Sequence, residues 1–296
     1  MSRRRPARPG GINRRTPTRT AAAAAVVLLA LTACSSPAGG QEENAASPFP
    51  THVHALALKP GTTDVLLASH EGIFELDGNE LRPTGANIDL MGFAVDGNGD
   101  YLASGHPGPG VDLPNPVGLI RSTDGENWTQ ESLAGQSDFH ALAATSGGII
   151  GFDGTLRLSG DGKTWSDSPT QLTPYSLAGS PSGPLAVATT EDGAYRSDDA
   201  GRSWSKIPDS PVIMLAAVTA QSRIVGVLPD GRILTSEDPG APWDSAGQVA
   251  GYPVAVTAAE TEDGLQIWVM TDAGLEHSAD GGKSFSTLVQ QPAGTS

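Results

Sequence analysis

Hydrophobic positions in this chain come in short runs that are separated by glycine-rich and Asp-Gly turns. Two examples are the runs Pro184–Thr189 and Gln266–Met270. Runs of this length, without a sustained three-and-four-residue spacing of apolar positions, predict β-strands rather than helices. The sequence therefore predicts an all-β domain built of many short strands.

A polar motif recurs between these runs and reveals their period. One full copy, here called the Ser-x-Asp motif, is Ser197-Asp198-Asp199-Ala200-Gly201-Arg202-Ser203-Trp204. Other copies begin at Ser122, Ser159, Ser236 and Ser278. Their aspartates follow one another at steps of 37, 38, 39 and 42 residues: Asp124, Asp161, Asp199, Asp238 and Asp280. A period near 40 residues that contains strands is that of a propeller blade.

The motif resembles the Asp-box (BNR) repeat, Ser-x-Asp-x-Gly-x-x-Trp, of sialidases and of many non-enzymatic propellers. The resemblance implies that each copy forms the turn between the third and fourth strands of a blade, far from the central axis. Serine and aspartate oxygens would accept backbone N–H groups there, and glycine permits a positive φ. The aromatic residue would pack between blades. The aromatic positions are Trp128, Trp165, Trp204, Trp243 and Phe285.

The spacing predicts a six-bladed β-propeller over residues 51–291, with four antiparallel strands in each blade and a tail at 292–296. Small residues mark the innermost strands, where blades converge. We expect these strands to begin at His54, Met91, His140, Tyr175, Ile213 and Pro253. The first blade has only Leu76-Asp77-Gly78-Asn79 in place of the motif. No overlapping strand that would close the ring is evident, so the mode of closure is open.

The N-terminal 33 residues are typical of an export signal. An arginine-rich start precedes the apolar run Ala21–Leu31, and Leu31-Thr32-Ala33-Cys34 resembles a bacterial lipobox. The resemblance implies lipidation of Cys34, a flexible tether over 34–50, and anchoring to the outer face of the bacterial cytoplasmic membrane. The pair Arg14-Arg15 lacks the apolar residues that usually follow a twin-arginine signal, which favours the general secretory route.

The cysteine content of the chain excludes an intrachain disulfide, and its net charge limits the partners that it can bind. Cys34 is the single cysteine, so an intrachain disulfide is excluded. Loss of residues 1–33 removes seven arginines and no acidic residue, which leaves 11 basic and 33 acidic side chains and a net charge of −22. Such a surface repels nucleic acid and anionic lipid and attracts cations, and it also favours solubility.

Most histidines fall on one predicted face. In an up-and-down blade, the start of the first strand and the end of the second share a face opposite the Ser-x-Asp motif. Five histidines of blades one to three lie at such positions: His52, His54, His70, His106 and His140. His277 lies on the other side, beside the last motif. Met91 corresponds to His54, and Asp89 and Asp138 correspond to His52.

This constellation predicts a transition-metal site. Imidazole is the commonest metal-binding side chain, and a nearby thioether favours copper over zinc or calcium. The predicted ligands are His52, His54, Met91 and His140, with His70 and His106 placed to complete or gate the site. Asp89, Asp112, Asp138 and Tyr175 complete the predicted ligand-binding face. Two alternatives remain open, namely binding or catalysis without a metal, and hydrogen bonding between blades.

The insertion His106–Pro116 projects from the same predicted face. Its prolines limit the conformational entropy lost on ordering, so it suits a fixed lid. A tolerated surface insertion is the alternative. The stretch Asp96-Gly97-Asn98-Gly99-Asp100 begins like a calcium loop, but Tyr101 and Pro107 occupy its sixth and twelfth positions, which predicts a hairpin turn instead.

Sialidase activity is not expected, because the family's catalytic motifs are missing. Leu81-Arg82-Pro83 only partly matches the Arg-Ile-Pro motif, and Arg121, Arg157 and Arg196 adjoin the Ser-x-Asp motifs. Another glycoside hydrolase would need two carboxylates about 5–5.5 Å or about 6.5–9.5 Å apart, and the sequence cannot select them. Metal binding is the preferred function. A glycan-binding or glycan-hydrolysing protein is the alternative, and a scaffold for assembly of another exported protein is the third.

Overall fold

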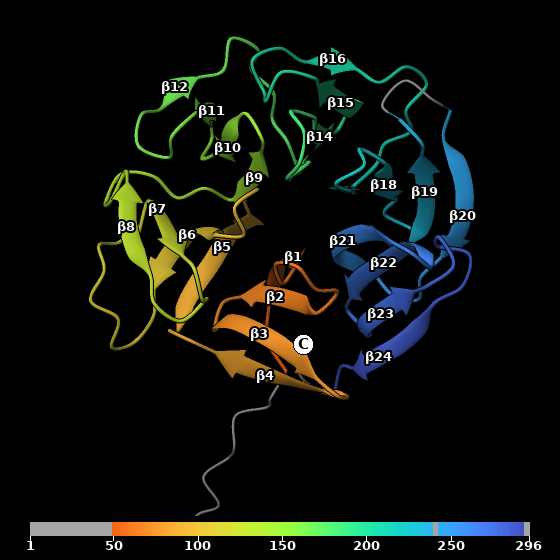
Figure 1. The fold of residues 1–296 in the computed structure, drawn as a ribbon, viewed down its shortest axis with the longest axis horizontal. Helices are drawn as coiled ribbons and strands as arrows, with labels where there is room; N and C mark the ends of the chain where they lie inside the picture. The colour runs from red at the N-terminus through yellow and green to blue at the C-terminus, as the bar shows by residue number, and fades with distance from the viewer. Residues whose placement is uncertain (1–48, 239–241, 293–296) are drawn as a thin grey trace, which may run out of the picture. The chain divides into compact units, whose positions relative to one another are not determined.

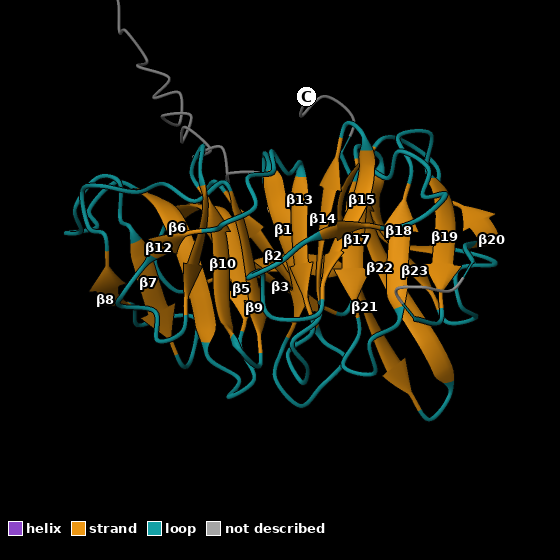
Figure 2. Ribbon diagram, turned by 90° about the horizontal axis from the view of Figure 1, so that it is seen from above, coloured by secondary structure: helices purple, strands orange, loops and turns teal. Residues whose placement is uncertain are grey.

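The computed structural model describes residues 49–238 and 242–292. The predicted signal peptide, Cys34 and nearly all of the predicted tether lie outside the described residues, as do 293–296. The described part contains 24 strands and no helix, arranged as six four-stranded antiparallel sheets around an axis (Figures 1 and 2). The predicted all-β, six-bladed propeller is therefore confirmed. Within these residues, no helix is long and apolar enough to cross a membrane.

The blades follow one another along the chain, and each uses four consecutive strands. Blades one to three consist of β1 (Val53–Leu58), β2 (Val65–Ser69), β3 (Gly72–Asp77) and β4 (Glu80–Thr84); β5 (Ile88–Val95), β6 (Tyr101–Pro107), β7 (Leu119–Ser122) and β8 (Thr129–Ser132); and β9 (Ala141–Thr145), β10 (Gly148–Phe152), β11 (Leu156–Ser159) and β12 (Ser166–Asp167). Blades four to six consist of β13 (Ser176–Gly179), β14 (Ala186–Thr190), β15 (Gly193–Ser197) and β16 (Ser205–Lys206); β17 (Leu215–Val218), β18 (Ile224–Val227), β19 (Arg232–Ser236) and β20 (Asp244–Gln248); and β21 (Pro253–Thr261), β22 (Gly264–Thr271), β23 (Gly274–Ser278) and β24 (Ser286–Gln290).

The burial of a strand depends on its place in the blade, and its amino-acid sequence reflects this. The second strands β2, β14 and β18 are buried at every position. Neighbouring blades cover both faces of these strands, and this explains why their sequences are nearly continuous apolar runs. The outermost strands β12 and β16 are short and exposed.

The Ser-x-Asp motifs form turns between third and fourth strands, as expected. In the blade-two turn, the Ser122 hydroxyl accepts the Gly125 N–H at 2.9 Å, and Asp124 Oδ1 accepts the Asn127 N–H at 2.8 Å. These bonds hold the pKa of the Asp124 carboxyl well below its usual range. The same serine–glycine and aspartate–backbone bonds recur at Ser159, Ser197 and Ser278. Residues 239–241 of the remaining motif lie outside the described part.

The motif aromatics pack between blades. Trp165 lies against Phe139, with ring centroids 4.7 Å apart, and its indole N–H donates to Ser132 Oγ of the preceding blade at 2.9 Å. Trp128, Trp204, Trp243 and Phe285 likewise pack against buried clusters. The motif is thus a structural element that ties each outer edge to its neighbour.

The ring closes by apolar packing, which answers the question that the sequence left open. No strand is shared between blades in the described part of the chain. One buried cluster joins Leu67 and Phe74 of blade one to Trp268 and Met270 of blade six. Phe49, which the sequence analysis assigned to the tether, belongs to this cluster and is only 5% exposed. The packed domain therefore extends to Phe49.

Candidate metal centre

The residue at the start of each first strand, which is bulged in blades one, two and six, shapes the channel mouth. In blades one, two and six the bulged residues are His54, Met91 and Val254, which have no partner in the ladder. In blades three to five, the residues at the equivalent position are His140, Tyr175 and Met214. Their backbone N–H groups donate to carbonyl groups of the second strand. Bulges re-aim side chains. Five of the six residues, all but Met214, line a cavity of about 890 Å³.

This register corrects the predicted alignment of two first strands. Met214 donates to the Val227 carbonyl as His140 donates to that of Phe152. Met214 and Val254, rather than Ile213 and Pro253, are therefore equivalent to His54. The runs of small apolar residues in blades five and six fit two registers that differ by one residue, and the bulge selects between them.

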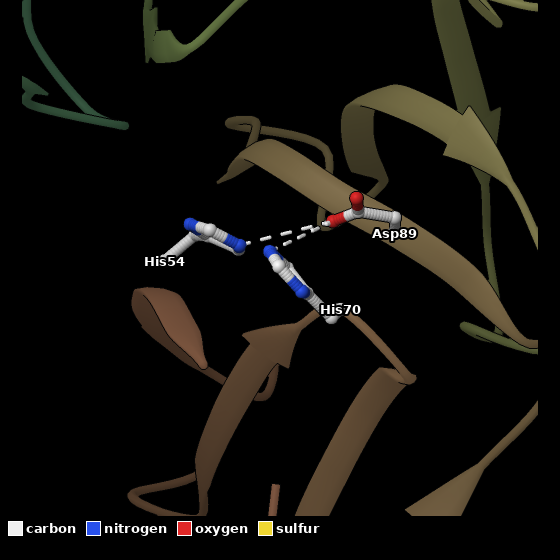
Figure 3. A group of neighbouring side chains, drawn as sticks. All are labelled: His54, His70 and Asp89. Atoms are coloured by element: carbon white, nitrogen blue, oxygen red, sulfur yellow. Dashed lines mark ion pairs between the residues drawn. The ribbon is translucent and has the colours of Figure 1, made fainter. Parts of the chain in front are cut away.

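Three predicted face residues converge at the interface of blades one and two. His54 Nε2 lies 3.7 Å from Asp89 Oδ1, and His70 Nε2 lies 3.8 Å from the same oxygen (Figure 3). All three ligand atoms lie within 4.8 Å of one another. His54 comes from the start of β1, His70 follows the end of β2, and Asp89 comes from β5. We call this group the blade-one triad.

The electrostatics of the blade-one triad favour a cation. His54 Nε2 and Asp89 Oδ1 are both buried, and neither has a hydrogen-bond partner within the described residues. Burial lowers the pKa of His54, and the charge of His70 lowers it further, against an opposing effect of Asp89. His54 is therefore a neutral imidazole at pH 7, with a lone pair available as a ligand.

The spacing within the blade-one triad fits an ion after a small adjustment. A tetrahedral ion with ligand bonds of ~2.1 Å places its ligand atoms ~3.4 Å apart. The observed 3.7 and 3.8 Å separations exceed that value by a few tenths of an ångström. Such a change is within the reach of imidazole and carboxylate rotations.

A second group lies at the interface of blades two and three. His106 Nε2 and His140 Nε2 lie 3.1 and 2.8 Å from the same oxygen, Asp138 Oδ2. His106 Nδ1 lies 2.7 Å from Asn115 Oδ1 in the insertion. The contact with Asn115, together with the charge of Asp138, raises the pKa of His106. We call His106, Asp138 and His140 the blade-two triad.

Gly105 sets the distance between the strands that carry both triads. Its φ is +144°, and a Cβ at this position would lie 1.9 Å from the Asp89 carbonyl oxygen. Only glycine allows this approach. Asp89 and His106 are direct partners across the β5–β6 ladder, so the two triads adjoin.

The structure thus divides the predicted single site into two groups. His52 belongs to neither triad, although its ring lies 4.7 Å from that of His70. Met91 lines the cavity without belonging to either triad. Asp89 and Asp138, predicted only as face residues, are the centres of the two groups. Asp112 is exposed in the insertion and belongs to neither triad.

The opposite side of the mouth is aromatic. Tyr175 and Tyr252 are 62% and 49% exposed, and burial together with the nearby Tyr252 raises the pKa of Tyr175. The Tyr252 hydroxyl also donates to Met214 Sδ at 3.1 Å. Tyr175 was predicted as a residue of this face, whereas Tyr252, Met214 and Asn115 were not. The methionine was recognisable as the counterpart of Met91 once the bulge register was known, whereas Asn115 carried no sequence signal.

Two sequence interpretations agree with local contacts. Asp96 and Asp100 both accept from the Arg121 guanidinium, at 2.6 and 2.8 Å. The calcium-like stretch is therefore a turn held by an arginine. His277 lies away from both triads, stacks on Trp268 with ring centroids 4.8 Å apart, and contacts Gln266 Oε1 at 3.0 Å.

Fold and mouth together define a six-bladed β-propeller with a histidine- and aspartate-lined channel entrance. The sequence matches no known family model and no curated protein. Solved propellers are similar in fold. The GH74 enzyme of Niastella koreensis is 16% identical with a TM-score of 0.58, over 78% of this chain and 36% of that chain. The GH74 xyloglucanase of Xanthomonas campestris is 14% identical with a TM-score of 0.51, over 75% of this chain and 37% of that chain.

A third similar structure is virginiamycin B lyase from Staphylococcus aureus. It is 12% identical with a TM-score of 0.51, and the match covers 80% of this chain and 83% of that chain. The present chain spans little more than a third of the GH74 chains that it matches. At these identities the comparisons support a shared β-propeller fold, and they assign no activity to this chain.

Proposed function

We propose that this protein binds a divalent transition-metal ion at the blade-one triad, His54, His70 and Asp89. One observation carries the proposal. His54 Nε2 and Asp89 Oδ1 are buried, face each other at 3.7 Å, and have no hydrogen-bond partner within the described residues. Buried polar atoms are normally paired, and an ion between the two would satisfy both.

The proposed site borders the cavity through His54. Two imidazoles and one carboxylate are a donor set used by non-haem iron and catalytic zinc sites, and they leave coordination positions vacant. A bound ion would therefore be accessible to a ligand, a metal carrier or a side chain of a partner protein. Together with the lipobox-like sequence at Cys34, this supports metal handling at the bacterial cell envelope, or assembly of another exported protein, as the biological role.

The choice of metal depends on Met91. Imidazole and carboxylate favour zinc, iron(II) or copper(II), whereas a thioether favours copper(I). Met91 lines the same cavity as His54. Copper is therefore among the proposed ions. Met91→Leu distinguishes binding of copper(I), which would use the thioether, from binding of an ion that would not. The variant would weaken copper(I) binding but leave zinc binding unchanged if only the softer ion uses the sulfur.

The test is calorimetric titration of the full chain in detergent with zinc, copper(II) and, under anaerobic conditions, copper(I). We expect sub-micromolar binding of at least one ion that is lost in a His54→Ala/His70→Ala variant. Asp112→Asn is the matched control, because it removes a carboxylate from the same predicted face without touching the blade-one triad. Absence of binding, or equal binding by the double variant, would overturn the proposal.

Glycan binding is a second candidate, favoured by the exposed pair Tyr175 and Tyr252 beside the cavity. Exposed aromatic rings offer flat apolar faces. The fold similarity to GH74 enzymes is compatible with this use, and hydrolysis would need two suitably spaced carboxylates. Binding on a glycan array that persists after chelation and disappears in Tyr175→Ala/Tyr252→Ala would favour this candidate over the metal.

A further inference from the structure

We infer that the mouth binds a second metal ion at the blade-two triad, His106, Asp138 and His140, next to the first ion. This inference rests on the proposed metal-binding function and extends it from one ion to a pair. It concerns residues that the structure separates from the blade-one triad, and its test gives a separate readout.

The two triads share two members at equivalent positions. Asp89 and Asp138 lie two residues before Met91 and His140, which are equivalent residues at the start of their blades. Each aspartate faces a histidine at the end of the second strand of the preceding blade, His70 for Asp89 and His106 for Asp138. The third members differ in origin, because His54 comes from the blade before that of Asp89, whereas His140 comes from the same blade as Asp138. Adjacent blade interfaces thus present the same donor set, two imidazoles and one carboxylate.

Asn115 orients His106 as a metal ligand. With its amide oxygen 2.7 Å from Nδ1, this asparagine accepts a hydrogen bond from the Nδ1–H of His106. Metal-bound histidines commonly donate their other ring N–H to a carbonyl or carboxylate. The Nε2 lone pair then faces Asp138 Oδ2 at 3.1 Å. Two acceptors at that separation require a cation, which is either a proton on Nε2 or a bound ion.

One oxygen of the Asp138 carboxylate is available for a further contact. Its Oδ1 is buried and has no hydrogen-bond partner within the described residues. Three of the six buried side-chain atoms without a partner in the described part belong to the two triads: His54 Nε2, Asp89 Oδ1 and Asp138 Oδ1. An ion in each triad would supply the partner that these three atoms lack within the described residues.

Among the described residues, the ligand atoms of the blade-one triad all lie within 4.8 Å of one another, whereas those of the blade-two triad do not, so a side chain of the blade-two triad must move to close around an ion. The side chain of His140 is 58% exposed, so it can rotate toward the cavity without repacking the core. The insertion already holds His106 through Asn115. We therefore expect the second ion to bind more weakly than the first, because its site is less preorganised.

The test is ion stoichiometry of the full chain in detergent, measured with zinc by native mass spectrometry and by metal analysis after gel filtration. We expect two zinc ions per chain in the wild type. Asp138→Asn should reduce this number to one and leave the tighter binding step unchanged. Asn115→Ala should weaken the second step by about 10- to 100-fold, as is typical for the loss of a residue that orients a ligand. Asp112→Asn, in the same insertion, should bind two ions.

The outcomes separate the inference from the proposed function. One ion per wild-type chain, lost in Asp89→Asn but kept in Asp138→Asn, would overturn the inference and leave the blade-one site standing. It would mean that His106 holds a proton instead. One ion that depends on Asp138 and not on Asp89 would instead overturn the blade-one proposal and retain a metal at the blade-two triad. Two ions that Asp138→Asn leaves in place would overturn the inference.

Discussion

His54 Nε2 and Asp89 Oδ1 face each other at 3.7 Å across the interface of blades one and two, and neither makes a hydrogen bond within the described residues. The separation is within the range of an ion pair but too long for a hydrogen bond. Burial lowers the pKa of His54, so the carboxylate has an uncharged neighbour on this side at pH 7. This arrangement destabilises the metal-free protein and favours the binding of a cation.

Replacement of Asp89 by asparagine tests this relationship. The variant removes a carboxylate whose buried Oδ1 makes no hydrogen bond within the described residues, so we expect the metal-free protein to be stabilised by about 1 kcal/mol or left unchanged. The wild type should gain about 2.7 kcal/mol when zinc is at a hundred times its dissociation constant, and the variant should lose most of that gain. Thermal unfolding with and without zinc measures both effects.

Asp112→Asn is the control for this experiment, because it removes a carboxylate that belongs to neither triad. It should leave both the stability and the zinc-dependent gain unchanged. An Asp89→Asn protein that is strongly destabilised without metal would show that Asp89 has a structural role and would contradict its assignment as a metal ligand.

The repeat made the fold predictable. The four copies of the Ser-x-Asp motif that lie wholly within the described residues form their turns through bonds inside the motif, as in the Gly125 N–H to Ser122 Oγ bond, so the sequence alone specifies these turns. The bulge register is different. Met214 and Ile213 are both apolar and adjacent, and only the pairing of Leu215 with Val227 shows which of them corresponds to His54.

Closure of the ring was beyond sequence reasoning for a physical reason. It depends on apolar contacts between Phe49 and residues of blade six such as Trp268, which are more than 200 residues away in sequence. Apolar contacts between distant residues leave no local pattern in the sequence. A strand shared between the first and last blades would leave one, because its pairing partner can be sought in the sequence. Phe49 was therefore predicted as part of the tether.

Phe49→Ala tests the closure. Because Phe49 is 5% exposed and packs on both terminal blades, we expect a loss of about 3 kcal/mol in the free energy of unfolding. Urea unfolding measures this loss. Val212→Ala, at a position 52% exposed, should change the free energy by less than about 0.5 kcal/mol. Equal effects of the two variants would argue against a closing role for Phe49.

The candidate site was predicted as a set of residues but not as a geometry. Strand position placed His54, His70 and Asp89 on one face, because the start of a first strand and the end of a second strand meet there. The partition into two triads arises from interblade contacts, in which Asp89 faces blade one and Asp138 faces blade two. Interblade distances depend on side-chain packing, and Asn115 enters from an irregular insertion, so neither followed from periodicity.

His277 allows a test of stability against pH that is independent of the mouth. Burial lowers its pKa below the usual 6.5. The unfolded chain therefore binds a proton more readily than the folded protein as the pH falls through 6.5. The contribution of His277 to stability is complete above that pH and is lost as the pH falls through the lowered pKa of the folded state.

His277→Phe keeps a ring on Trp268 and removes the titrating group. The stability of this variant relative to wild type should therefore rise as the pH falls from 7 to 5. Urea unfolding of both proteins across that range measures the difference, in which the other histidines cancel. A difference that is constant with pH would show that the His277 pKa is the same in the folded and unfolded states.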